Sequence, residues 1–292
     1  MKIRNISIIL TALVVNTLVS IYIGQSSYSW LPVQAAAESQ LVDNLFSFLV
    51  TLGAFIFFGV IGTLVYSMIF HRAAEYDLSD GPAIEGNITL EIVWTVIPII
   101  LVFWIAGYSY QIYVKMAIRG PMEHAHNHNM EQVQLADNVE KIEVISKQWA
   151  WVFRYPDRNV TSTELHLPVD RRVHLALTSE DVIHGFYIPA FRVKQDIIPN
   201  HNIHFEFTPI REGNYRLSDS QYSGTFFATM DANVVVESAE NYQNWLEDAA
   251  RLKPSPAYNQ ASFEYERELQ HPNASGWQTI PPASPPIVNY HN

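Results

Sequence analysis

A cluster of three histidines could take part in metal chemistry. His124, His126 and His128 stand at alternate positions among Asn and Ala, within a linker expected at 120–139. Three imidazoles in five residues could capture a metal ion, but the neighbouring sequence supplies no further ligand and no element that would fix the geometry. We therefore interpret this run as a solvated loop.

Cysteine is absent from all 292 residues. Its absence excludes disulfides, thiolate copper or zinc sites and iron–sulfur clusters. The sequence also shows no Ser/His/Asp triad, phosphate loop or carboxylate pair, so nothing in it predicts catalysis by this chain alone.

Three stretches without Asp, Glu, Lys or Arg indicate a membrane protein. About 20 apolar residues in a helix cross a hydrocarbon layer of roughly 30 Å. The stretches are long enough and cover residues 5–37, 44–70 and 92–114. We expect membrane helices near 6–24, 44–70 and 91–114. Within the second, Gly53, Gly59 and Gly62 would let a neighbouring helix approach closely.

The first stretch has two interpretations. Lys2 and Arg4 precede an apolar run, and Ala35-Ala36-Ala37 resembles a cleavage site, so residues 1–37 could be a signal peptide. The apolar run ends near Gly24, far from that site, which favours a retained helix. Either choice makes 38–119 a transmembrane helical hairpin, with its loop at 71–90 inside and everything after 115 outside.

The composition changes after the third helix. Residues 121–292 carry 13 basic and 22 acidic side chains, so most of the net charge of −11 lies there. An acidic surface disfavours nucleic acid and could attract a cationic protein partner.

Residues 140–250 alternate apolar and polar side chains and contain Pro and Gly turns, as at Tyr155-Pro156-Asp157. This pattern predicts an antiparallel β-sandwich or barrel, closed by an amphipathic helix near 239–250. Residues 251–292 hold seven prolines and little apolar periodicity. We expect them to form a mostly unpacked, Pro-rich tail.

Four separated strings carry a family resemblance. In chain order they are 82–98, which contains Glu91-Ile92-Val93-Trp94-Thr95; Gln148-Trp149-Ala150-Trp151; 181–196, which begins Asp181-Val182-Ile183-His184-Gly185-Phe186; and Tyr222-Ser223-Gly224 with Met230. Together they closely resemble subunit II of the haem-copper terminal oxidases over roughly residues 40–246. The resemblance implies an all-β, cupredoxin-like Greek-key sandwich held by two helices over the outer face of a catalytic subunit I.

Copper-bearing members of that family hold a dinuclear centre that accepts electrons from cytochrome c. The resemblance implies ligands at one upstream His and a Cys-x3-Cys-x3-His-x2-Met run with a Glu between the cysteines. The upstream His is present as His184. The run falls on Asp219, Gln221, Ser223, Phe227 and Met230. Both bridging thiolates and one imidazole are therefore missing.

The substitutions predict that the dinuclear centre is lost, because such a pair needs soft, anionic sulfur bridges. A mononuclear site of His184, Asp219 and Met230 is the less favoured alternative. We expect Phe227 to fill the vacated space near Met230. We also expect Asp219 or Ser223 to hydrogen-bond His184, because a buried imidazole needs a polar partner.

Family members without this centre are typically quinol oxidases. The resemblance therefore implies subunit II of a proton-translocating terminal oxidase that reduces O2 to water and takes electrons from a quinol at subunit I. Haem and copper are expected in subunit I and none in this chain, with subunit III and membrane lipid as further partners. The layout also resembles copper-less subunits of photosynthetic prokaryotes, which suggests a plasma or thylakoid-type membrane with the sandwich on the outer or lumenal side.

The sequence leaves two alternatives open. The chain could be a non-redox docking or assembly subunit of an oxidase fed by cytochrome c. It could also belong to a nitric oxide reductase, which shares the architecture and differs in its subunit I.

Other family positions carry weaker implications. Glu91 matches a carboxylate at the mouth of a proton-uptake route, although a carboxylate at a helix N-terminus also interacts favourably with the helix dipole. Trp149 matches the aromatic through which electrons enter, but sandwich packing is the favoured interpretation here. Gln221 replaces an acidic residue that helps to bind magnesium. Arg192 and Lys194 would face subunit I, and His201 and His204 are expected at the surface.

Overall fold

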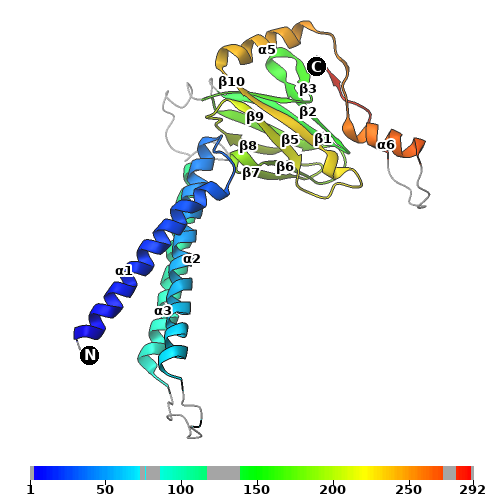
Figure 1. Cartoon of the computed structure of the whole chain (residues 1–292). Helices are drawn as coiled ribbons and strands as arrows, with labels where there is room; N and C mark the ends of the chain where they lie inside the picture. The colour runs from blue at the N-terminus through cyan, green and yellow to red at the C-terminus, as the bar shows by residue number, and fades with distance from the viewer. Residues whose placement is uncertain (1–2, 73–75, 77–85, 117–138, 272–280, 291–292) are drawn as a thin grey trace. The chain divides into compact units, whose positions relative to one another are not determined.

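The computed structural model describes residues 3–72, 76, 86–116, 139–271 and 281–290 (Figure 1). The chain divides into two compact units. The first comprises 1–31 and 42–115, and the second comprises 32–41 and 116–292. His124, His126 and His128 lie outside the described residues, as does nearly all of the linker expected at 120–139.

Among the described residues, three long helices are apolar enough to cross a membrane, as the charge-free stretches predicted. They are α1 (Ile3–Ser26), α2 (Ala37–Phe70) and α3 (Ile88–Met116), and a short 3-10 turn, η1 (Ser27–Trp30), follows α1. Helix α2 begins earlier than expected because its first turns belong to the second unit. There the buried Glu38 pairs with Arg172 at 2.7 Å. A charge-free stretch therefore indicates which residues can lie in a membrane, but it does not locate the first residue of the helix.

Helices α1 and α2 lie close together at Gly24. A Cβ atom added there would lie 1.8 Å from Thr51 Oγ1, so any side chain would force the helices apart. Ser47 Oγ also donates to Gly24 O at 2.7 Å. A Cβ atom at Gly53 or Gly62 meets no described atom within 4 Å. A Cβ atom at Gly59 would lie 3.7 Å from Asn16 Nδ2 of α1, an ordinary van der Waals contact. Among the described residues, the tight contact is therefore at Gly24 and not at the three glycines that the sequence suggested.

Aromatic side chains join α2 to α3. The ring of Phe48 lies edge-on to Trp104 and Tyr108, with centroids 5.0 and 5.5 Å away. Such edge-to-face pairs add to the stability that burial alone provides. Pro98 lies inside α3 without ending it.

The second unit is a β-sandwich of two five-stranded sheets (Figure 1). Their strand orders are β3-β2-β1-β5-β8 and β4-β10-β9-β6-β7. The strands are β1 (Glu140–Lys147), β2 (Ala150–Tyr155), β3 (Val160–Ser162), β4 (Leu165–Pro168), β5 (Val173–Ser179), β6 (His184–Ile188), β7 (Val193–Ile197), β8 (Ile203–Phe207), β9 (Gly213–Asp219) and β10 (Asp231–Glu237). Three 3-10 turns lie between them: η2 (Pro156–Arg158), η3 (Pro189–Phe191) and η4 (Phe227–Thr229).

Each sheet contains one parallel pair, so the expectation of a purely antiparallel sandwich is corrected. β1 runs parallel to β5, and β4 runs parallel to β10. Both pairs join strands that are distant in the chain, and sequence periodicity reports only which residues alternate. The alternation itself is present, since Val173, Leu175 and Leu177 are all fully buried.

Helix α5 (Ala239–Arg251) closes the sandwich, as predicted for 239–250. Its buried side chains are Tyr242, Leu246 and Ala249, a spacing that places them on one helical face. Ser238 caps the helix by accepting a hydrogen bond from Asn241 N at 3.2 Å.

The C-terminal segment is packed, and the prediction of a mostly unpacked tail at 251–292 is wrong for its described part. It forms β11 (Ser255–Pro256), α6 (Gln260–Gln270) and β12 (Ile287–Val288). Ala261 is fully buried within the sandwich core cluster, and Val288 is 1% exposed. Asn289 N also donates to Thr161 O at 3.0 Å. This packing could not be predicted from the proline-rich sequence, because a few isolated apolar contacts produce no periodic pattern.

The Ala35-Ala36-Ala37 run extends the sandwich. Ala35 and Ala36 are fully buried. Ala35 N donates to Ala190 O at 3.0 Å, and Ala37 N donates to Thr208 O at 2.9 Å. These small residues therefore have a packing role in the sandwich.

Candidate functional site

The centre of the site is a hydrogen bond between two adjacent strands. His184 opens β6 and Asp219 closes β9, and the two strands pair where Phe186 lies opposite Asp219. His184 Nδ1 lies 2.8 Å from Asp219 Oδ2, and both side chains are fully buried. This is the hydrogen bond expected from the sequence.

Asp219 has further donors around its carboxylate. Gly185 N and Gln221 N donate to Oδ1 at 2.7 and 3.0 Å, and Ser223 Oγ donates to Oδ2 at 2.8 Å. Burial would by itself raise the pKa of the Asp219 carboxyl, but these hydrogen bonds and that from His184 lower it. Asp219 is therefore an anion whose acceptor positions are occupied by protein groups.

Asp181 completes the surroundings of His184. Its Oδ1 lies 2.9 Å from His184 Nε2, so the imidazole is held between two carboxylates. Burial opposes protonation, but the hydrogen bonds to Asp219 and Asp181 outweigh it and raise the pKa of His184. Gln148 N also donates to Asp181 Oδ2 at 2.7 Å. Sequence reasoning did not assign Asp181 this role, although the Asp-x-x-His spacing is a signal for it.

The remaining positions of the run lie beside this cluster. Met230 is 1% exposed, and its carbonyl accepts from Trp151 Nε1 at 3.0 Å. Phe227 is half-buried, and its ring lies 5.2 Å from that of Tyr222. The buried ring of this loop is Phe226. That Phe227 fills the vacated space near Met230 stays a prediction.

Trp149 is buried as well, with 2% of its surface exposed. Its Nε1 donates to Ser223 O at 2.9 Å, and its ring packs edge-on against Phe226 at 5.2 Å. Gly224 has φ of +113°, and a Cβ there would lie 2.7 Å from the Trp149 ring. Glycine is therefore needed at that position for both the backbone conformation and the close approach.

A dinuclear copper centre does not fit the residues present. The site offers one imidazole and one thioether from His184 and Met230, together with a carboxylate and a hydroxyl from Asp219 and Ser223. Hard oxygen donors do not provide the soft, anionic bridges that such a centre requires. Within the described residues, no group of three or more His, Cys, Asp or Glu side chains could hold a metal ion.

The other candidate residues are dispersed. Glu91 lies in the first turn of α3, where Asn87 Oδ1 accepts from Leu90 N at 3.2 Å. Arg192 Nη2 donates to Pro32 O at 2.6 Å, and Lys194 is exposed. His201 and His204 are exposed, as expected.

The fold and this site define a membrane-anchored subunit with a cupredoxin-like β-sandwich. Its two parts each match a family model. Residues 24–112 match the transmembrane domain of cytochrome c oxidase subunit II, and residues 160–239 match its periplasmic domain. The chain belongs to the cytochrome c oxidase subunit II family and is a subunit of a haem-copper terminal oxidase, an oxidoreductase complex. It is a membrane protein with its sandwich on the outer side.

Two relatives, each matched over most of its length, agree with this assignment. Cytochrome c oxidase subunit 2 of Synechocystis sp. is 33% identical, covering 89% of this chain and 87% of the relative. The corresponding protein of Thermostichus vulcanus is 31% identical, covering 85% and 86%. The solved periplasmic domain of cytochrome oxidase subunit II from Bradyrhizobium japonicum is 27% identical, with a TM-score of 0.35, covering 37% of this chain and 90% of that one.

Proposed function

We propose that this chain is subunit II of a quinol-fed terminal oxidase, in which electrons reach O2 without passing through the sandwich. The observation that carries the proposal is the saturated Asp219 carboxylate. It occupies the first bridging-thiolate position and binds His184, Ser223 and two backbone N–H groups. A metal at this position would have to break that network, and the site offers it no thiolate in return.

A covered entry point supports the same conclusion. Trp149, at the position implied for electron entry, is 2% exposed. The C-terminal segment contributes to this cover, because Ala283 N donates to Gln148 O at 2.5 Å and Tyr265 packs against Phe226. A soluble electron donor would therefore find no exposed indole here.

In this proposal the chain binds its partner subunits and positions them, and it does not transfer electrons. Haem and copper reside in the partner subunit I, where the quinol also binds, and subunit III and lipid complete the complex. Glu91, in the first turn of α3, provides a carboxylate for proton entry. The complex lies in a prokaryotic plasma or thylakoid-type membrane and translocates protons.

Oxygen consumption by the purified complex tests the proposal. We expect turnover with a reduced quinol and none with reduced cytochrome c. The full chain purified alone in detergent should contain no stoichiometric copper and show no near-infrared charge-transfer band after incubation with copper. Turnover with cytochrome c but not quinol would overturn the proposal and favour the docking or assembly role.

A restored ligand set provides the matched control. The variant D219C/Q221E/S223C/F227H reinstates the family's run beside His184 and Met230. We expect this variant alone to acquire a near-infrared band on incubation with copper, because it supplies both bridging thiolates. A band of equal strength in the wild-type chain would contradict the argument.

A further inference from the structure

Two histidines contact each other on the solvent-facing side of one sheet of the sandwich. His174 lies on β5, and His204 lies on β8, the strand at the edge of that sheet. Their ring centroids are 5.0 Å apart, and the ring planes differ by 29°. Among the described residues, no other two imidazoles make a ring contact. His184 belongs to the other sheet, so this pair is separate from the site described above.

The pairing of β5 with β8 brings the two side chains together. His174 stands opposite Glu206, and His204 lies two residues before Glu206 on β8. Diagonal neighbours on one face of an antiparallel pair are within reach of long side chains. Leu175 and Phe205, which follow the two histidines along their strands, are buried. Since successive side chains alternate between the faces of a strand, both histidines point away from the core.

The separation of the two rings suits a shared metal ion. A zinc-bound imidazole nitrogen lies about 2.1 Å from the metal and the ring centre about 1.1 Å beyond it, so two rings in tetrahedral positions have centres about 5 Å apart. The centroid separation of 5.0 Å matches this value. The last side-chain torsion of histidine has broad minima, so each ring can turn one nitrogen towards a common ion at little cost.

The charge state of the pair also favours a metal ion. Burial lowers the pKa of His174, and the neighbouring His204 and Lys141 act in the same direction. Glu206 opposes this effect without outweighing it. An imidazole binds a metal in its neutral form, so a lowered pKa reduces the competition from protons. Lys141 is exposed, and its flexible stem lets the ammonium turn into solvent.

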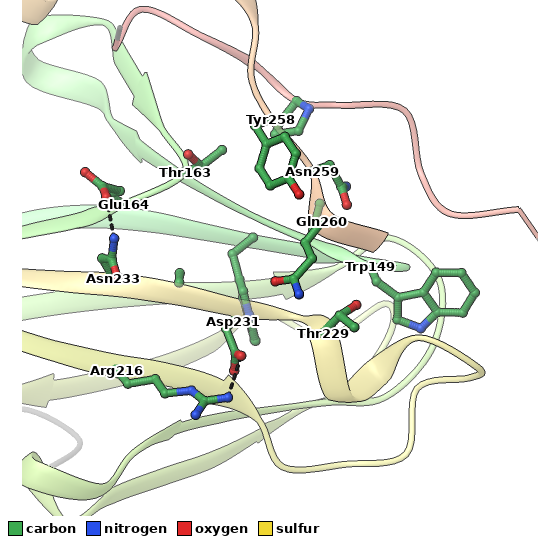
Figure 2. A pocket seen from close by; sticks show the side chains of 14 residues that line it. Trp149, Thr163, Glu164, Arg216, Thr229, Asp231, Asn233, Tyr258, Asn259 and Gln260 are labelled. Carbon is green, nitrogen blue, oxygen red and sulfur yellow. Dashed lines mark hydrogen bonds and ion pairs between the residues drawn. The ribbon is translucent and has the colours of Figure 1, made fainter. Parts of the chain in front are cut away.

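The cavity beside the C-terminal segment offers a metal less suitable ligands. Its volume is about 420 Å³, and Figure 2 shows the two carboxylates that line it, Glu164 and Asp231. Asn233 Nδ2 donates to Glu164 Oε1 at 2.6 Å. Arg216 Nη2 donates to Asp231 Oδ2 at 2.5 Å. Among the described residues, no histidine lines the cavity, and imidazole suits zinc better than a carboxylate that is already hydrogen-bonded.

We propose that His174 and His204 bind a divalent transition-metal ion, zinc above all, with water in the remaining positions. Two neutral imidazoles on adjacent strands provide the nitrogen ligands that such ions prefer. A bound ion would link the edge strand β8 to β5. This site goes beyond the proposed function and does not rest on it.

Titration of the full chain with Zn²⁺ in detergent, in competition with a chromophoric chelator, tests the proposal. The chain carries no histidine tag. His124, His126 and His128 are replaced by Asn in every protein titrated, because three imidazoles in the linker could bind zinc by themselves. We expect a single saturable site with Kd on the order of 10 μM.

His204→Ala is the diagnostic variant, because the residue is exposed and its removal should leave the fold intact. We expect binding at least about ten-fold weaker, since even the loss of a group that only supports a metal ligand has an effect of this size. His271→Ala is the matched control. It removes another exposed histidine, which follows α6, and should leave the affinity unchanged.

Ala176→His tests the location by a gain of affinity. Ala176 stands opposite His204 in the pairing of β5 with β8 and lies on the same face as His174. A third imidazole there should tighten zinc binding at least about ten-fold, because it replaces a water ligand.

Several results would overturn the proposal. They are the absence of saturable competition with the chelator, an unchanged affinity in His204→Ala, and equal weakening by His271→Ala. An unchanged affinity in a folded Ala176→His variant would do the same, because a site formed by this pair must respond to a third imidazole beside it. Circular dichroism of each variant checks that the sandwich remains folded, and His204→Ala decides the question if Ala176→His does not fold.

Discussion

Replacing Asp219 by Ala should destabilise the sandwich far more than removal of an ordinary surface carboxylate. The substitution leaves His184 Nδ1 and Gly185 N without their buried acceptor, at 2.8 and 2.7 Å in the present structure. Each stranded buried group costs about 1–3 kcal/mol. Ser223 can rotate its hydroxyl and Gln221 N is partly buried, so they add little. We expect a total loss of about 4 kcal/mol.

Urea unfolding of the full chain, followed by tryptophan fluorescence, measures this loss. With a slope of about 2 kcal/mol per M, the midpoint should fall by about 2 M. Asp231→Ala is the matched control, because Asp231 pairs with Arg216, whose side chain is 70% exposed. Such a pair contributes about 0–1 kcal/mol. If the two variants differ by less than about 1 kcal/mol, the reasoning about the buried network is refuted.

Asp219→Asn separates charge from shape. Its amide oxygen can still accept from Gly185 and Gln221, and its NH2 can donate to His184 if the imidazole carries its proton on Nε2. We expect a smaller loss, about 1–2 kcal/mol, because the charge-assisted part alone disappears. A loss as large as that of Asp219→Ala would show that charge, rather than hydrogen-bond geometry, holds the site.

Three further predictions concern other parts of the second unit. The lowered pKa of Glu164 means that its contribution to stability is complete above its ordinary value of 4.5 and is lost as pH falls towards about 2. Glu164→Gln should therefore flatten stability over that acid range, and an unchanged pH curve would contradict this. Ser238→Ala removes the cap of α5 and should cost about 1 kcal/mol in urea unfolding, with oxygen consumption unaffected. Deleting 252–292 should expose Trp149, seen as stronger acrylamide quenching and a red-shifted emission; unchanged quenching would show that this segment does not cover the indole.

Local signals in the sequence were enough for the membrane part and for the class of the second unit. The length of a charge-free stretch follows from the thickness of a bilayer, so α1, α2 and α3 could be predicted without tertiary information. Alternation of apolar residues likewise predicted strands such as β5, where every second side chain is buried. These signals depend only on near neighbours in the chain.

Contacts between distant segments could not be predicted in this way. The Pro-rich C-terminal segment is packed because single residues are buried: Ala261 joins the core cluster of the sandwich, and Val288 is 1% exposed. The close contact at Gly24 depends on where Thr51 of another helix lies. Neither contact has a periodic pattern, so neither is visible before the chain is folded.

One property of the candidate site follows from the sequence, and another depends on the tertiary structure. The sequence by itself determined that no cysteine stands at 219 or 223, and hence that thiolate-bridged copper is chemically unsupported. Only the tertiary structure decided what replaces it. The pairing of β6 with β9 places Asp219 against His184, and Gln148 holds Asp181 on the other side of the imidazole. Side chains 35 residues apart meet there because strand pairing and burial, rather than spacing along the chain, set their distance.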